Sequence, residues 1–370
     1  RPPARPPRAW YLLPLLLAVL LAGAGTGWLV RERADRFDLG EIREDAGPAV
    51  VRVFASSCSG TGVATGLLID DDRVLTVAST LTGPVSVAVQ TADGRVRPAQ
   101  AEGVDRDGVV VLQLLDEPLG TPPAVLADTT PVDGLDVPVL GFIDGRQDID
   151  MHAITRSSGG TDLVGVSGLL PASAAGSAVL DREGRAIGLV TRPGQTGTRA
   201  VGLGVLREFA ERSRETSVLP RVSGCTEAKG SQAAVLPELD GPSGALAEEV
   251  QRVLGSYLTG MNRHDEQAMR ATFTGRLDKS PGLTAEALEA VYRTTTIFGA
   301  VIRSVRQDGD GAQAEMSYVA LRSADPDRKN LKCLRWDITY ILDRVDGELR
   351  IAQVTPARGR EEAYRSCAED

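Results

Sequence analysis

The pattern of apolar and polar positions changes three times along the chain. Residues 10–30 run without a charged side chain, and residues 31–46 are strongly charged. From residue 47 to about 226, short apolar runs alternate with turns rich in glycine, proline and aspartate. Beyond residue 241, apolar residues first recur at helical spacing and then alternate over longer runs. The pattern predicts an apolar N-terminal segment, an all-β domain and a small α+β domain.

The all-β segment contains two consecutive sets of predicted strands. The first set covers 49–55, 60–69, 74–78, 85–91, 95–101 and 109–115. After a proline-rich connection at 118–131, the second set covers 137–143, 149–156, 163–168, 178–180, 186–190 and 200–205. The interval 205–214 has helical spacing and is expected to close the domain. Each set has enough strands for one small barrel.

The α+β segment follows a linker expected at 227–241. Helices are predicted at 246–261, 266–273 and 284–292, the last one with Thr284 as its N-cap. Four strands are predicted at 297–305, 311–322, 331–342 and 349–354. In the third strand one face carries Leu334, Trp336, Ile338, Tyr340 and Leu342. This alternation predicts a sheet with one buried face.

The uncharged segment 10–30 has 21 residues. At about 1.5 Å per residue it spans roughly 31 Å, enough to cross the apolar part of a bilayer. The alternative is a cleaved signal peptide that ends at Ala22-Gly23-Ala24. The apolar run continues through Val30, which favours a retained single-pass anchor. We expect a cytoplasmic tail at 1–9 and a spacer at 31–46.

Composition narrows the function classes. The chain carries 41 Lys and Arg against 50 Asp and Glu, a formal net charge of −9. This balance argues against a nucleic-acid partner, because phosphate binding requires a basic surface. The four cysteines form no C-x-x-C motif, so a zinc ribbon is not expected. We expect no metal and no cofactor. Two cysteines in each predicted domain favour disulfides and therefore a location outside the cytoplasm.

Four motifs, in order, resemble one family. They are Cys58–Ile69 with Arg73–Ala78, Gly108–Leu114, Ser173–Thr191 and Val222–Thr226. The first is similar to C-x-G-x-G-x-x-x-G-[FV]-x-[IV] followed by [VI]-L-T-x-A-H, and the third to the active-serine hairpin. Together they resemble the trypsin-like (chymotrypsin-fold, HtrA-like) serine peptidases, in particular their membrane-anchored actinobacterial branch. The resemblance covers residues 47–226 and implies a double β-barrel.

The same resemblance identifies the catalytic positions. The family's histidine falls on Ser79, its aspartate on Gly108 and its nucleophilic serine on Ala175. In the family the serine hydroxyl attacks the substrate, the histidine takes the proton of that hydroxyl, and the aspartate orients the histidine, so their joint replacement removes the covalent route. The oxyanion loop falls on Ser173 and Ala174, with Ser173 at a position where the family has glycine. We therefore expect vestigial sites and no catalytic residues.

The rest of the chain offers no evident substitute. Its two histidines are His152, in a predicted strand of the second barrel, and His264, beyond the double barrel. The first lysine is Lys229, so a Ser–Lys dyad is not available either. Ordinary structural roles are expected for the remaining polar groups near the three positions: Ser173, Ser177, Asp105 and Asp107.

The resemblance also implies a Cys58–Cys225 disulfide, which leaves Cys333–Cys367 to pin the C-terminal tail. Residues 242–358 resemble the nuclear transport factor 2-like (SnoaL-like) fold, on element order and on the helix–turn 257–265. Such folds have a cone-shaped pocket. His264 and Asp337 are the candidate polar groups for it, although surface or capping roles are the simpler interpretation.

Our hypothesis is a pseudopeptidase anchored in the plasma membrane by a single pass, with its C-terminal bulk extracytoplasmic. It would bind or scaffold a protein or peptide in the cell envelope without cleaving it. Three alternatives remain: a serine peptidase with a rearranged site, small-molecule binding or catalysis by residues 242–358, and a structural envelope protein without a ligand. Residues 359–370 are expected to form a tail.

Overall fold

The computed structural model describes residues 37–369 except 59, 116, 144, 158–162, 195–196, 221, 226, 229, 242, 323–330, 358 and 360–361. The predicted anchor at 10–30 therefore lies outside the described residues. Within the part described, no helix is both long and apolar enough to span a membrane. The chain divides into two compact units, residues 1–41 and residues 42–370. The second unit begins within helix α2 (Leu39–Ala46) and holds all the other described elements.

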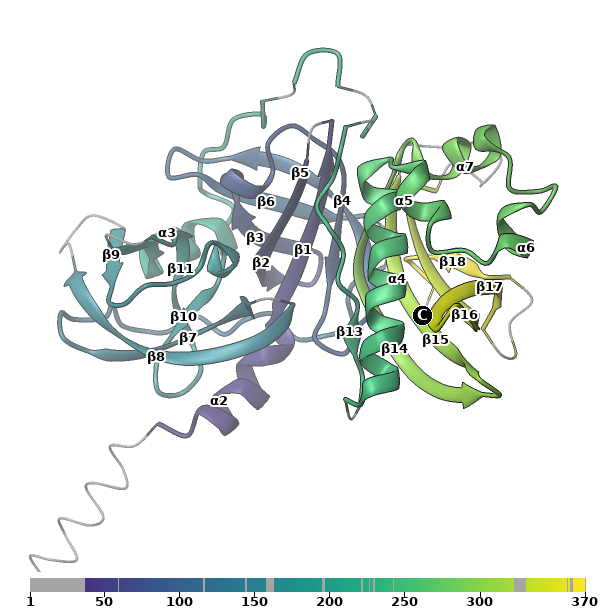
Figure 1. Cartoon of the computed structure of the whole chain (residues 1–370). Helices are drawn as coiled ribbons and strands as arrows, with labels where there is room; N and C mark the ends of the chain where they lie inside the picture. Colours follow the sequence, from purple (N-terminus) through teal and green to yellow (C-terminus); the bar gives the residue numbers. More distant parts are fainter. Residues whose placement is uncertain are drawn as a thin grey trace, which may run out of the picture. The chain divides into compact units, whose positions relative to one another are not determined.

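Two closed barrels of six antiparallel strands form the N-terminal part of this unit (Figure 1). The strands of barrel 1 are β1 (Val50–Ser57), β2 (Thr61–Asp70), β3 (Arg73–Val77), β4 (Pro84–Gln90), β5 (Val96–Val104) and β6 (Val109–Leu114). They close in the order β1-β2-β3-β6-β5-β4. The strands of barrel 2 are β7 (Asp136–Ile143), β8 (Arg146–Ser157), β9 (Leu163–Val166), β10 (Ala178–Leu180), β11 (Ala186–Arg192) and β12 (Thr198–Gly202). They close in the order β10-β11-β12-β9-β8-β7. Helix α3 (Leu203–Ala210) follows. The predicted double barrel is confirmed.

Each barrel encloses its own apolar core. Barrel 1 is filled by side chains such as Val53, Leu68 and Leu112, all at most 1% exposed. Barrel 2 is filled in the same way by Val137 and Ile187. Burying these side chains on the inner face of short, strongly curved strands is what closes each sheet on itself.

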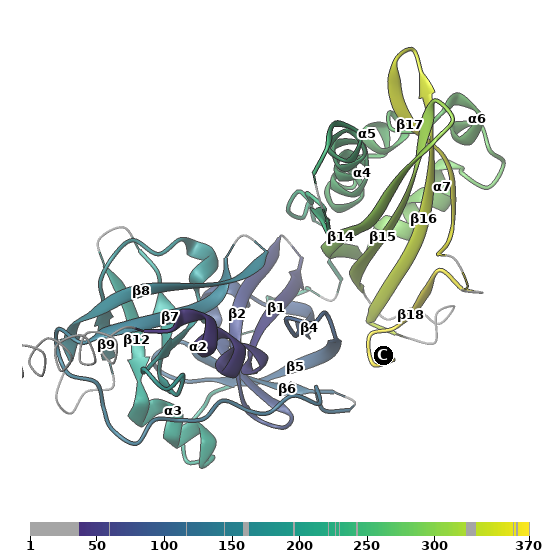
Figure 2. The same cartoon turned by 90° about the horizontal axis from the view of Figure 1, so that it is seen from below.

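The C-terminal part combines helices with a sheet, seen edge-on in Figure 2. The helices are α4 (Ala245–Arg263), α5 (Glu266–Arg270), α6 (Gly275–Asp278) and α7 (Ala285–Tyr292). The strands are β13 (Glu238–Leu239), β14 (Thr295–Asp308), β15 (Gly311–Arg322), β16 (Cys333–Val345), β17 (Glu348–Pro356) and β18 (Tyr364–Ser366). The sheet order is β13-β14-β15-β16-β17, with β18 paired to β16.

The sequence predicted three of these helices and four of these strands. It missed α6, β13 and β18, because elements of two to four residues are too short to show a periodicity. The predicted buried face of β16 is real: Leu334, Ile338, Tyr340 and Leu342 are at most 4% exposed. They pack against α4 in one cluster that includes Leu254 and Leu258. The SnoaL-like assignment remains a prediction.

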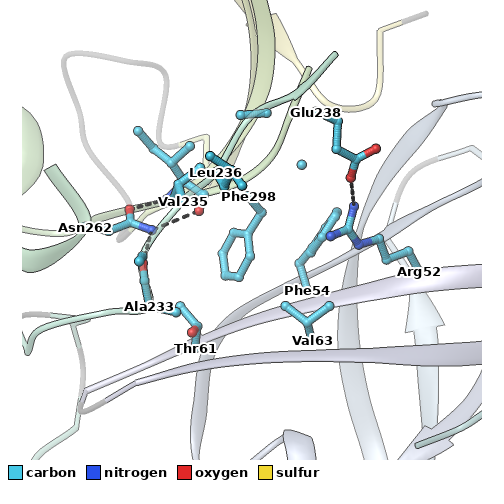
Figure 3. A pocket seen from close by; sticks show the side chains of 14 residues that line it. Arg52, Phe54, Thr61, Val63, Ala233, Val235, Leu236, Glu238, Asn262 and Phe298 are labelled. Atoms are coloured by element: carbon cyan, nitrogen blue, oxygen red, sulfur yellow. Dashed lines mark hydrogen bonds and ion pairs between the residues drawn. The ribbon is translucent and has the colours of Figure 1, made fainter. Parts of the chain in front are cut away.

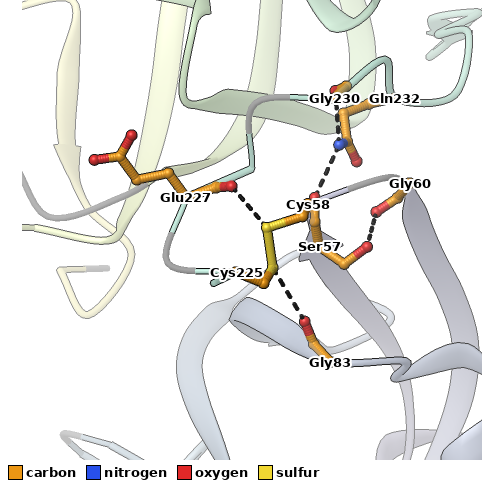
Figure 4. The surroundings of a disulfide bond; sticks show 8 residues. All are labelled: Ser57, Cys58, Gly60, Gly83, Cys225, Glu227, Gly230 and Gln232. Atoms are coloured by element: carbon orange, nitrogen blue, oxygen red, sulfur yellow. Dashed lines mark hydrogen bonds between the residues drawn. A yellow bond between two sulfur atoms is a disulfide. The ribbon is translucent and has the colours of Figure 1, made fainter. Parts of the chain in front are cut away.

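The segment expected to be a linker is instead packed against its neighbours. Gly230 N–H donates to the Cys58 carbonyl over 2.8 Å. Gln232 is 4% exposed and donates from Nε2 to the Ser57 carbonyl over 3.0 Å (Figure 4). The adjacent Cys58–Cys225 disulfide ties the end of the barrel domain to the same strand end.

Barrel 1 and the C-terminal sheet share a small apolar core. It joins three residues of barrel 1 to residues of β14, β15, β16 and the C-terminal tail: Phe54, Ala88, Val96, Phe298, Val319, Leu321, Cys333 and Cys367. The Cys333–Cys367 disulfide lies inside this core, so both expected disulfides are present. Ser86 Oγ donates to the Arg322 carbonyl (2.9 Å), and Arg335 Nη1 to the Gly94 carbonyl (3.1 Å). The two modules are therefore joined by packing as well as by the chain.

Candidate functional site

The loop that carries Ala175 is a short turn that leads into strand β10. Ala172–Ala174 form a single 3-10 turn, and β10 begins at Ala178. Ala175 is 3% exposed, and its N–H donates to the Ala172 carbonyl over 3.2 Å. An oxyanion hole needs free N–H groups that converge on the developing charge. The Ala175 N–H is instead already hydrogen-bonded within the turn.

The same loop is fastened to barrel 1. Thr65 on β2 donates its N–H to the Ala175 carbonyl over 2.9 Å. Gly176 has φ +85°, and a Cβ on it would lie 1.9 Å from the Thr65 carbonyl oxygen. Only glycine fits this close approach in a left-handed conformation, so the turn requires glycine at this position. The loop is thus held at the junction of the two barrels.

Ser79 and Gly108 lie next to each other in barrel 1. Ser79 is in the 3-10 turn Ala78–Thr80 that follows β3, and Gly108 directly precedes β6. The Ala78 N–H donates to the Gly108 carbonyl over 2.8 Å. The turn before β6 therefore lies against the one that follows β3.

A hydrogen-bonded path also joins β3 to the Ala175 loop. Thr76, three residues before Ser79, donates from Oγ1 to the Thr65 carbonyl over 2.8 Å, and Thr65 in turn binds Ala175. The structure thus connects the loops of the three proposed triad positions. The assignment of Ser79, Gly108 and Ala175 as remnants of a triad remains a prediction.

The carboxylates beside Gly108 are engaged elsewhere. Asp105 has a fully buried side chain; Oδ1 accepts from the N–H groups of Asp107 and Val109, and Oδ2 from Arg214 at 2.8 and 2.9 Å. Asp107 is also paired with Arg214. Burial alone would lower the pKa of the Arg214 guanidinium, but hydrogen bonds to Glu208 and Asp105 outweigh it and raise this pKa. Neither aspartate is available to orient a base.

The other polar residues considered as nucleophile or base are not assembled either. Ser177 is 0% exposed, and its Oγ has no hydrogen-bond partner among the described residues. His152, on β8, places Nδ1 2.8 Å from the Ser167 carbonyl, which can only accept, so Nδ1 carries the proton. No described interaction brings His152 to Ser177 or Ala175.

The two candidate polar groups of the C-terminal module have different partners. His264 caps α4 in a left-handed conformation (φ 57°) and stacks on Tyr292 at 5.6 Å between ring centroids. Asp337 pairs with Arg365 at 3.7 Å, on the face of β16 opposite to the one that α4 covers. On the face of the sheet that α4 covers, the rings of Tyr257 and Tyr340 pack together with 6.1 Å between their centroids. No described contact joins His264 to Asp337.

Among the described residues, no group of three or more His, Cys, Asp or Glu side chains is placed to hold a metal ion. Sequence reasoning missed another cluster, in which Arg52 and Phe54 on β1 and Phe298 on β14 line a cavity (Figure 3). Arg52 also lines a second cavity. The members of this cluster are far apart in the chain, so no local motif could have shown it.

Comparison with known proteins gives an assignment for the barrels. A family model described as "Trypsin-like peptidase domain" matches residues 64–189. A search of curated proteins finds no match. A serine endoprotease from Yersinia pestis aligns with a TM-score of 0.43 and 20% identity, over 47% of this chain and 65% of that one. Rv3671c from M. tuberculosis H37Rv, solved as a serine-to-alanine mutant in an inactive form, aligns with a TM-score of 0.40 and 23% identity, over 48% of this chain and 94% of that one.

The chain therefore contains a trypsin-like peptidase domain with the double barrel of the chymotrypsin fold. It spans 65% of the length of the Yersinia protein.

Proposed function

We propose that this protein is a trypsin-like pseudopeptidase, which binds or scaffolds a protein or peptide without cleaving it. The observation that carries the proposal is the state of the Ala175 loop. The side chain at the nucleophile position has no reactive atom, and the N–H beside it is bound to the Ala172 carbonyl. Loss of nucleophile and base together leaves only background catalysis.

The retained architecture supports a binding role. The loop is still fastened to β2 through Thr65, and the Gly176 conformation that the turn needs is intact. Features that shape the barrel junction are kept, while those that only the reaction needs are absent. Because the barrels are closed and well packed, the domain would present a preformed surface to a partner.

The first experiment measures active-site labelling of the full chain with a fluorophosphonate probe. No labelling is expected, either for the natural chain or for an Ala175→Ser variant, because a serine without a base is a weak nucleophile. Trypsin serves as the positive control. Labelling of the natural chain that maps to Ser177 would overturn the proposal in favour of a rearranged active site.

The second experiment tests binding without cleavage. Fluorescent unfolded casein is mixed with the full chain, and its anisotropy is followed for hours before the mixture is separated on a gel. Higher anisotropy with intact casein is the expected result. Casein fragments would contradict the proposal, and unchanged anisotropy would count against a general affinity for unfolded chains.

We further propose that residues 10–30 anchor the protein and that the barrels lie outside the cytoplasm. The support is the uncharged 21-residue run and the presence of two disulfides. In cells that express the full chain, the protein should stay in the membrane pellet after alkaline carbonate extraction. Externally added protease should digest the barrels in intact spheroplasts. A protein released by carbonate, or one protected until lysis, would disprove this placement.

A further inference from the structure

Two adjoining cavities lie between strand β1, the segment that precedes α4, and strand β14. The first, about 120 Å³, has an apolar side formed by Phe54, Val63, Leu236 and Phe298 (Figure 3). The second, about 490 Å³, is lined by charged side chains of both signs: Arg52, Asp93, Arg146, Glu238, Asp240 and Arg303. Arg52, Glu238 and Gly299 line both cavities, so the two adjoin at these residues.

Arg52 lies where the two cavities adjoin, and its guanidinium has few and long hydrogen bonds for a buried cation. Its side chain is 14% exposed. Nη1 reaches the Gly145 carbonyl at 3.3 Å and Glu238 Oε1 at 3.5 Å, both at the long end of the hydrogen-bond range. Nε is buried and has no hydrogen-bond partner among the described residues. The guanidinium also lies 4.9 Å from the centre of the Phe54 ring.

Burial lowers the pKa of the Arg52 guanidinium, and Glu238 only partly offsets this effect. An arginine keeps its charge in proteins, so the buried guanidinium still needs hydrogen-bond acceptors for its N–H groups. A carboxylate can supply these acceptors, because it forms two parallel N–H···O bonds with the planar guanidinium.

The ion pairs around the second cavity leave two of its arginines, Arg52 and Arg146, without a close carboxylate partner. Arg303 binds Asp240 at 2.9 Å, and Asp93 binds Arg95 at 2.9 Å. Arg146, next to Gly145, is exposed and forms no ion pair within the described residues. Of the three arginines that line this cavity, Arg146 therefore has no carboxylate partner among the described residues, and Arg52 has only the 3.5 Å contact with Glu238.

We propose that these cavities bind a carboxylate carried on a short branched aliphatic group. The carboxylate lies between Arg52 and Arg146, and the aliphatic group enters the apolar side against Phe54 and Phe298. The volume limits the group, since an apolar cavity of about 150 Å³ holds benzene, and this one is smaller. A free branched acid and the C-terminal leucine or valine of a peptide share this chemistry. The inference does not depend on the proposed loss of peptidase activity.

Calorimetric titration of the full chain with 4-methylvalerate tests the proposal, with 4-methylvaleramide as the neutral analogue of the same shape. The acid should bind with a stoichiometry of one. The amide should bind at least about tenfold more weakly, because it cannot form the charge-assisted pair. Equal affinity of acid and amide, or binding of neither, would overturn the proposal.

Two variants test the two ends of the site. Arg52→Met should weaken acid binding at least about tenfold and abolish the preference over the amide. Val63 is 37% exposed, so Val63→Phe can fill the apolar side from the surface and should block the acid without unfolding the barrel. Arg306→Met, at a 4.0 Å contact with Glu315 outside both cavities, is the matched control. If Arg52→Met fails to fold, the comparison of acid with amide and the Val63→Phe variant still test whether the carboxylate binds at this site. Unchanged acid binding in Val63→Phe would contradict the proposed position.

A peptide arm separates the two sources of the ligand. A pentapeptide ending in leucine is titrated with a free and with an amidated C-terminus. Tighter binding of the free peptide than of 4-methylvalerate identifies a chain terminus as the ligand. Binding of the small acid but of neither peptide identifies a free acid instead.

Discussion

The ring of Phe54 on β1 lies 5.0 Å from the ring of Phe298 on β14, with an angle of 36° between their planes. This pair joins barrel 1 to the C-terminal sheet. Strand β14 bulges at this point, and Gly299 (φ +53°) places no side chain where a Cβ would be 3.3 Å from Phe54 Cζ. The bulge thus makes room for the ring, and the two modules share a core.

Removal of this ring should uncouple the modules. Phe54→Ala deletes a side chain that is 0% exposed, a change that typically costs about 3–5 kcal/mol. Because the loss falls at the junction, the thermal unfolding of the full chain should separate into two transitions in differential scanning calorimetry. Val125→Ala, at a side chain 65% exposed, is the control and should leave the trace unchanged. A single transition with an unshifted midpoint in Phe54→Ala would contradict the role of this pair.

Placing triad residues at the three proposed positions should not by itself create peptidase activity. In the triple variant Ser79→His, Gly108→Asp, Ala175→Ser, the N–H of residue 175 remains bound to the Ala172 carbonyl. The loss of one oxyanion donor typically costs about 100- to 1,000-fold in rate. Adding Ser173→Gly, which gives the turn more backbone freedom, should raise the rate of fluorophosphonate labelling above that of the triple variant. Equal labelling rates in the two variants would show that the turn is not limiting.

Arg214 should be important for stability, since it neutralises the fully buried Asp105. Arg214→Met leaves that carboxylate without its cation, a change that costs about 3–5 kcal/mol when a buried pair is broken. The double variant Arg214→Met, Asp105→Asn should be more stable than the single one, as urea unfolding can show. Arg212→Met, at an exposed pair with Asp70, is the control and should cost less than about 1 kcal/mol. Full additivity of the two changes would refute the pairing.

A pH effect is expected at the Glu249–Arg344 pair, which is bidentate with distances of 2.9 and 2.8 Å. Hydrogen bonds from Arg344 lower the pKa of Glu249 in the folded state. The stabilisation is therefore present above the ordinary carboxyl pKa and is lost as the pH falls through the lowered value. Glu249→Gln should melt about 1–2 °C lower at pH 7, with the gap closing below about pH 4. The exposed neighbour Glu248→Gln serves as the control; a gap independent of pH would exclude this linkage.

The alternation and turn residues of the sequence were sufficient to predict the barrels. Apolar residues at every second position, punctuated by glycine and aspartate turns, leave few ways to bury the strands, and two six-strand barrels result. The motif around Ala175 fixed the position of the hairpin within barrel 2. Cysteine number and spacing, with the family resemblance, fixed both disulfides. In each case the signal lies in a short stretch of chain.

The tertiary structure alone decided how these parts act on one another. The Ala175 N–H is hydrogen-bonded within its own turn, Arg214 forms a salt bridge with Asp105, and the ring of Phe54 packs against that of Phe298. The last two contacts join residues that are distant in sequence, and the first depends on the backbone conformation that the surrounding fold imposes. Periodicity and motifs report which face of an element is apolar, but not which other element will cover it. For that reason the chain alone indicated a missing nucleophile, whereas the cavity beside Arg52 and the shared core became visible only in the folded protein.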